Sequence, residues 1–249
     1  MEELYFNGTS YQFTRTRAFL SIGTISNDQL DKCISFAYNM TFANTGAHRD
    51  HRTGGQARRK KGQIFANTLQ GKIAEYAIYN ELKNVYHNIT EPDLSVYQLG
   101  AWDDSDLTIN NKKLSIKSTK HYSQLLLLET RDWDANGNYI PNTNNGNSEH
   151  YDYFILVRIK AQIEQIMKKH KLLYSNTITS IEFNELKNSI LASDWSYDIP
   201  GFITHNDLVE LINRNFRIPR NALLNNTRMD ATNYYVQAGD LRSIDTLNL

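Results

Sequence analysis

The segment from Tyr151 to Ile159 limits the possible folds most, because it predicts a β-strand that is buried on both faces. A sheet containing such a strand needs covering layers above and below it. A helix predicted over 63–83 carries apolar residues on most of its circumference, so it is expected to be covered on more than one side. We therefore expect an α/β fold with a mixed central β-sheet flanked by helices.

The composition is that of a folded chain. The 249 residues are 40% hydrophobic, and 27 Lys and Arg balance 27 Asp and Glu, which argues against global disorder. No run approaches the roughly 18 apolar residues of a membrane helix. The first residues lack the basic-then-apolar order of a secretory signal. We expect a cytoplasmic protein with no membrane partner, organised as a single domain over 1–249.

Two further patterns mark local structure, and the cysteine content excludes others. Ser26 and Gln29 form a potential capping box that predicts a helix over 27–42. The Asn-rich tract 136–147 predicts an exposed loop. The lone cysteine, Cys33, excludes an internal disulfide, and no Cys/His spacing indicates zinc.

A β-hairpin carries the residues with the most specific chemistry. Alternating segments at 106–109 and 114–119 flank a turn at 110–113, and the central turn residues are either 110–111 or 111–112. Because side chains alternate between faces, both registers place the same polar residues on one face: Asp106, Ser115 and Lys117. The apolar residues face the other way: Leu107, Ile109, Leu114 and Ile116.

This polar face has groups that can bind a divalent cation and act on a phosphate. The Asp106 carboxylate and the Ile116 carbonyl are oxygen ligands of the kind that Mg²⁺ prefers. Mg²⁺ lowers the pKa of a bound water and neutralises charge on a phosphate, while Lys117 would orient that water or stabilise the transition state. The simpler interpretation is a surface hairpin with a weak cross-strand Asp–Lys ion pair.

The segments Ser105-Asp106-Leu-Thr-Ile and Leu114-Ser115-Ile116-Lys117-Ser-Thr resemble the PD-(D/E)xK nuclease superfamily, and within it the type II restriction endonucleases. The preceding segment Gly71–Ile78, with Glu75, resembles the first core helix of that superfamily. The resemblance covers about 62–120 and implies a restriction-endonuclease-like core over about 62–160. An N-terminal helical and basic segment would precede this core, and a C-terminal segment would complete it and recognise DNA.

The resemblance implies Mg²⁺ as cofactor, with Asp106, Glu75 and Ile116 as metal ligands and Lys117 as a catalytic residue. Ser115 stands where the family usually has Glu or Asp, so one acidic ligand is missing. We expect Glu75 to supply the missing acid, with Glu129 as the alternative, reaching the site from a following helix. Asp103 and Asp104 precede the hairpin and are expected to be loop residues.

A basic stretch at 48–61 is the first candidate for DNA contact. It carries six cations and one acid in a chain of zero net charge: Arg49, Arg52, Arg58, Arg59, Lys60 and Lys61. Lys120 and His121 follow the catalytic strand and are further candidates for phosphate contact. The alternative for all of these residues is ordinary solvation.

The C-terminal part offers a second, weaker set of candidates. Asn233, Gln237 and Arg242 are of types that read base edges, although an ordinary structural role is favoured for them. Arg214, Arg217 and Arg220 are spaced three apart and are candidates for a second basic ridge.

Together with the resemblance, these features predict a sequence-specific, Mg²⁺-dependent double-stranded DNA endonuclease of the type II restriction class. The resemblance further implies a homodimer, and products that carry a 5′-phosphate and a 3′-hydroxyl. The alternatives are a structure-specific or repair nuclease of the same fold, and a catalytically inactive DNA-binding protein, which the serine at position 115 would explain.

Overall fold

A computed structural model describes residues 1–43, 59–95, 106–141 and 150–249. Its helices are α1 (Asn27–Thr41), α2 (Lys61–Leu82), α3 (Ile163–Lys169), α4 (Ser180–Leu191) and α5 (His205–Asn213). The longer strands are β5 (Lys112–Lys120), β6 (Leu125–Glu129), β7 (Tyr153–Ile159), β8 (Ser196–Thr204) and β12 (Asn233–Gln237). The short strands are β1 (Tyr5–Phe6), β2 (Tyr11–Gln12), β3 (Gly23–Thr24), β4 (Leu107–Ile109), β9 (Arg217–Ile218), β10 (Leu223–Leu224) and β11 (Thr227–Arg228).

The central sheet has five strands in the order β3-β8-β7-β5-β4. β5 and β7 pair in parallel, and the other neighbours pair antiparallel. β7 is buried on both faces, as predicted: Ile155 and Val157 belong to the apolar core on one side, and Phe154 and Leu156 to the core on the other. The mixed α/β class predicted from the sequence is confirmed.

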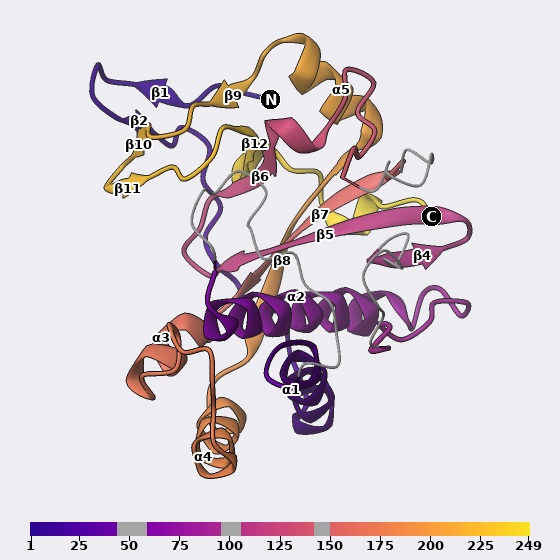
Figure 1. The fold of residues 1–249 in the computed structure, drawn as a ribbon. Coiled ribbons are helices and arrows are strands. Elements are labelled where there is room, and N and C mark those ends of the chain that lie inside the picture. Colours follow the sequence, from indigo (N-terminus) through magenta and orange to yellow (C-terminus); the bar gives the residue numbers. More distant parts are fainter. Residues whose placement is uncertain (44–58, 96–105, 142–149) are drawn as a thin grey trace.

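Helices cover one face of this sheet. In the view of Figure 1, α1, α2, α3 and α4 lie below the strands, with α2 directly against them. The capping box at Ser26 and Gln29 is formed, and it starts α1 at Asn27, as expected. α2 is buried around much of its circumference, because the sheet and α1 pack on different sides of it.

A second layer of strands covers the other face. β6, β12 and β9 form a three-stranded sheet, and α5 packs beside it. Leu126, Leu211 and Val236 from this layer share a core with Phe154 and Leu156 of β7. The predicted helix after Leu125–Leu128 is wrong, because these residues pair with β12, more than 100 residues further along the chain.

The N-terminal residues belong to this second layer. β1 and β2 join β10 and β11 in a small four-stranded sheet, which forms a lobe at the upper left of Figure 1. No helix in the described parts of the chain has the length and apolar character to cross a membrane.

Candidate functional site

The hairpin forms in the second of the two predicted registers. Asn110 and Asn111 are the turn residues, with φ of 48° and 62°, and Leu107 pairs with Leu114. Positive φ at both central residues is the mark of a type I′ turn, and asparagine tolerates it better than lysine does. Asp106 therefore precedes β4 and lies opposite Ser115, one pair beyond the last paired residues.

The Asp106 carboxylate accepts a hydrogen bond from β5 at the point where the backbone pairing with β4 ends. β4 begins at Leu107, and the backbone N–H of Ile116 donates to Asp106 Oδ2 over 2.6 Å. Alternate residues of β5 direct their backbone groups toward opposite neighbours, and Lys113 O accepts from Asp152 N on the β7 side. The C=O of Ile116 consequently points to the same side as its N–H, toward Asp106. The Asp106 carboxylate and the Ile116 carbonyl therefore lie on the same side of β5, next to the end of β4.

Lys117 projects from the face of the sheet opposite α2. Lys117 pairs with Leu156, which belongs to the core on the face away from α2. The adjacent Ile116 side chain points the other way and packs in the core between the sheet and α2. Lys117 is half-buried and forms no ion pair within the described residues. The simple cross-strand Asp–Lys pair is therefore not formed in this structure.

Ser115 is almost fully buried, with 2% of its surface exposed, and pairs with Phe154 of β7. A charged acid at this position would lose its solvation and would need a basic partner, for which Lys117, two residues further on the same face, is the nearest candidate. The serine leaves Asp106 as the carboxylate that the hairpin itself contributes.

Glu75 does not lie on the same side of the sheet as Lys117. It is 7% exposed on α2, and its Oε2 lies 2.7 Å from Lys72 Nζ, which in turn lies 5.2 Å from the ring of Phe36 in α1. Burial raises the pKa of the Cys33 thiol in α1, and the Glu75 carboxylate adds to this effect. The prediction that Glu75 shares a metal site with Lys117 finds no support in this placement, because the buried carboxylate has Lys72 as a partner.

Glu129, the alternative acid, ends strand β6 instead of lying on a helix. β6 belongs to the layer that packs on the Lys117 face of the central sheet. Glu129 Oε2 lies 3.7 Å from Arg131 Nε. Of the two acids, Glu129 is the one in the layer on the same side of the sheet as Lys117.

The donor set suits a Mg²⁺ ion with few protein ligands. Among the described residues, no cluster of three His, Cys, Asp or Glu side chains is arranged to hold a metal. Mg²⁺ in proteins commonly keeps several waters and uses one or two carboxylates together with substrate phosphates. Asp106 and the Ile116 carbonyl fit that pattern. Asp103 and Asp104 lie outside the described residues.

The predicted DNA-contact residues are only partly described. Arg49, Arg52 and Arg58 lie outside the described residues. Arg59 and Lys60 lead directly into α2, and Lys61 is its first residue, so these cations gather at the positive end of the helix macrodipole.

The two candidates after β5 have protein partners. Lys120 Nζ lies 2.9 Å from Glu164 Oε2, so this cation is partly neutralised. His121 lies between the rings of Phe19 and Tyr122, with centroid distances of 5.7 and 5.1 Å. These contacts favour a structural role for both residues.

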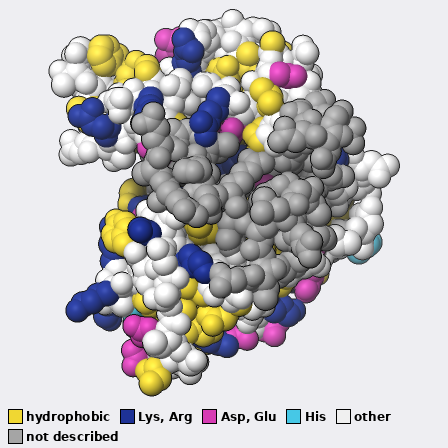
Figure 2. Space-filling view, in the orientation of Figure 1, with side chains coloured by type: hydrophobic (Ala, Val, Ile, Leu, Met, Phe, Trp, Pro, Cys, Tyr) yellow, Lys and Arg dark blue, Asp and Glu magenta, His cyan; other side chains and the backbone are white. Residues whose placement is uncertain are grey.

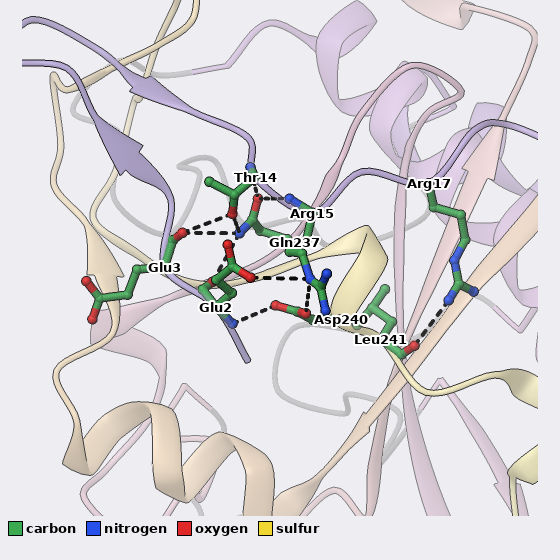
Figure 3. A network of polar contacts seen from close by, with 8 residues as sticks. All are labelled: Glu2, Glu3, Thr14, Arg15, Arg17, Gln237, Asp240 and Leu241. Carbon is green, nitrogen blue, oxygen red and sulfur yellow. Dashed lines mark hydrogen bonds and ion pairs between the residues drawn. The ribbon is translucent and has the colours of Figure 1, made fainter.

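The C-terminal candidates for base reading are structural. Gln237 is fully buried, and its side-chain carbonyl accepts from the backbone N–H groups of Thr14 and Arg15 over 2.8 and 3.0 Å (Figure 3). Asn233 donates to Ala231 O, and Arg242 pairs with Asp207 over 2.8 Å. This confirms the favoured alternative for Gln237 and Asn233.

A pocket of about 450 Å³ that no sequence pattern indicated lies beside the end of β8. His150 and His205 stack at its wall with ring centroids 3.9 Å apart. Burial lowers the pKa of His150, and the nearby His205 lowers it further. Burial raises the pKa of Asp152, but the amide of Lys113 and the ammonium of Lys112 outweigh this effect, so the net shift is downward. No local pattern predicts this pocket, because its lining residues come from three separate segments, at 150–153, at 204–207 and at Arg242.

Comparisons with protein-family models, with curated proteins and with solved structures found no match for this chain.

Proposed function

We propose that the protein is a Mg²⁺-dependent double-stranded DNA endonuclease of the type II restriction class. The observation that carries this proposal is the arrangement at the end of β4. There the Asp106 carboxylate is fixed by the Ile116 amide, the Ile116 carbonyl points the same way, and Lys117 follows on the same strand without an acidic partner among the described residues. Because Lys117 is half-buried and forms no ion pair within the described residues, a phosphate oxygen would be a favourable partner for its ammonium group.

Each group has a defined task in this reaction. Asp106 and the Ile116 carbonyl would hold Mg²⁺, which supplies charge neutralisation at the scissile phosphate and acidifies water. Lys117 orients the attacking water and stabilises negative charge on the phosphate oxygens. The water oxygen forms a bond to phosphorus, the bond from phosphorus to the 3′ oxygen breaks, and the departing oxygen takes a proton. The products are a 5′-phosphate and a 3′-hydroxyl.

Because position 115 is a serine, we expect metal binding at the site to depend on DNA. With one carboxylate on the hairpin, the protein alone offers little charge to a divalent ion, so a DNA phosphate would have to complete the ligand set. Glu129 is the acid that we retain as a further contributor, because its strand lies on the Lys117 side of the sheet.

The proposed DNA contacts and the proposed homodimer follow from duplex DNA as the substrate. The stretch 48–61 has a local charge of +5 and leads into the positive end of α2, which suits a phosphate backbone. A homodimer in the cytoplasm would cut both strands of a short two-fold symmetric site.

The test is incubation of the purified protein with phage-sized, unmethylated duplex DNA in Mg²⁺ and in EDTA, followed by gel electrophoresis. Discrete fragments in Mg²⁺ alone are the expected result. A Mg²⁺-dependent smear would indicate a less specific nuclease. Cleavage limited to branched or flapped DNA would indicate a structure-specific nuclease. Intact DNA under all conditions would contradict the proposal and support an inactive DNA-binding protein.

A further inference from the structure

The segment from Arg214 to Met229 has an unusual charge. It contains four arginines and no aspartate or glutamate, in a chain whose net charge is zero. All four are exposed: Arg214 after α5, Arg217 on β9, Arg220 in the turn that follows, and Arg228 on β11.

Backbone pairing fixes this segment. β9 pairs with β12, and β10 pairs with β11 so that Leu223 lies opposite Arg228. The chain reverses at residues with left-handed backbone conformations, namely Asn215 (φ 54°), Asn221 (φ 67°) and Asn225 (φ 49°). Asparagine tolerates this conformation, so the turns form with little strain. The arginines are therefore presented from a folded surface instead of a loose tail.

Their charges are not compensated. Arg214 lies 3.0 Å from Glu210, but Arg217, Arg220 and Arg228 form no ion pair with any residue that the structure describes. Arg228 Nη1 donates to Asn221 O over 3.2 Å, which brings this guanidinium next to the residue that follows Arg220. We call Arg217, Arg220 and Arg228 the arginine surface. Figure 2 shows dark-blue side chains over the lobe of β10 and β11, at the upper left.

We propose that the arginine surface binds the phosphate backbone of duplex DNA. Guanidinium groups pair well with phosphate oxygens, and each phosphate neutralised releases condensed counterions. β9 belongs to the three-stranded sheet that packs on the Lys117 face of the central sheet, so DNA bound here lies on the side of the candidate catalytic lysine. The choice of DNA as the polyanion rests on the proposed function.

The test measures binding of a fluorescent duplex in EDTA between 50 and 200 mM salt, so that cleavage is not needed. The test variant combines Arg217→Ala, Arg220→Ala and Arg228→Ala. Each phosphate contact contributes about 0.9 to the slope of log K against log salt, so we expect this slope to fall by about 2.7 and binding at 150 mM salt to weaken at least about tenfold. Lysine at the same three positions should keep most of the slope.

A matched control removes three cations that lie away from both the arginine surface and the basic stretch at 48–61. Lys32 on α1 pairs with Asp28, Lys83 follows the C-terminal end of α2 and bonds Asn80, and Lys187 on α4 pairs with Asp31 on α1. The control combines Lys32→Ala, Lys83→Ala and Lys187→Ala. Its DNA affinity and salt slope should stay close to those of the wild type.

An unchanged slope in the arginine variant, or an equal loss in the lysine control, would overturn the proposal. Loss of binding to phosphatidylserine vesicles with unchanged DNA binding would reassign the surface to lipid. DNA binding that depends on the arginine surface, in a protein that cuts no DNA, would support this inference while the proposed nuclease activity fails.

Discussion

Arg158 is fully buried near the end of the apolar strand β7, and its charge is satisfied by neighbours at least 35 residues away in the chain. Its Nε lies 2.8 Å from one oxygen of Asp198, its Nη2 bonds the other, and further N–H groups donate to the carbonyls of Arg17, Ala18 and Ser123. The ion pair joins β7 to β8, and the hydrogen bonds to Arg17 and Ala18 hold the segment before β3 against the central sheet.

We predict that Arg158→Met lowers the free energy of unfolding by about 3–5 kcal/mol, because Asp198 would keep a buried charge without its partner. The exposed pair Lys160–Asp194 provides the control, since both side chains are about half exposed. Lys160→Met should cost less than about 1 kcal/mol. Urea unfolding of both variants measures the difference, and similar values for the two would contradict the argument.

Individual residues differ in how far the sequence reveals their roles. Strand alternation alone places Ser115 and Lys117 on one face, and the pairing with Phe154 and Leu156 agrees, whereas Asp106 precedes β4 and its carboxylate accepts from the backbone N–H of Ile116. The amide of Gln237 can hydrogen-bond base edges, but in the structure it binds the backbone of Thr14 and Arg15. These partners lie more than 220 residues away in the chain, so no local pattern could identify them.

At the scale of elements, the β4–β5 hairpin sets the geometry of the candidate site. Its turn requires positive φ at Asn110 and Asn111, and this requirement selects one of the two registers that alternation left open. A different turn would change which residue lies opposite Asp106.

We predict that Asn111→Ala destabilises the protein by about 1–2 kcal/mol, because alanine resists the left-handed conformation. Asn111→Gly should be neutral or stabilising, since glycine adopts it freely. Thermal or urea unfolding of the two variants tests this. Equal stability of the alanine and glycine variants would mean that the turn does not require positive φ.

Element prediction succeeded where the signals are local. The capping box at Ser26 located the start of α1, and the alternating segments located β4 and β5. The helix expected to carry Glu129 is wrong, because residues 125–129 form a strand through their pairing with β12. The distant partner is absent from any local window, so a run of leucines remains ambiguous between helix and strand.

At the scale of the whole molecule, the N-terminal segment is held by the C-terminal part of the chain. Gln237 binds the backbone of Thr14 and Arg15, and Asp240 accepts from Glu2 N over 2.7 Å (Figure 3). The small sheet that carries part of the arginine surface includes β1 and β2, so its position depends on these contacts.

We predict that Gln237→Leu releases the N-terminal segment, because two backbone N–H groups would lose their buried acceptor. Hydrogen exchange over residues 1–18 should become faster, while α2 and β7 stay protected. Asp245→Asn is the control, since Asp245 is exposed and bonds only locally to Ser243 among the described contacts. Unchanged exchange at 1–18 in Gln237→Leu would show that other contacts hold the segment.

The most direct test of the central claim is the rate of Mg²⁺-dependent DNA cleavage by Lys117→Met. Lys112→Met is the matched control, because it removes a lysine from the same strand that is paired with Asp152 over 3.0 Å. If Lys117 orients the attacking water, its variant should cleave at least about 100-fold more slowly while binding DNA normally in EDTA. The control should cleave at the rate of the wild type. Cleavage by Lys117→Met at the wild-type rate would contradict the assignment of the site.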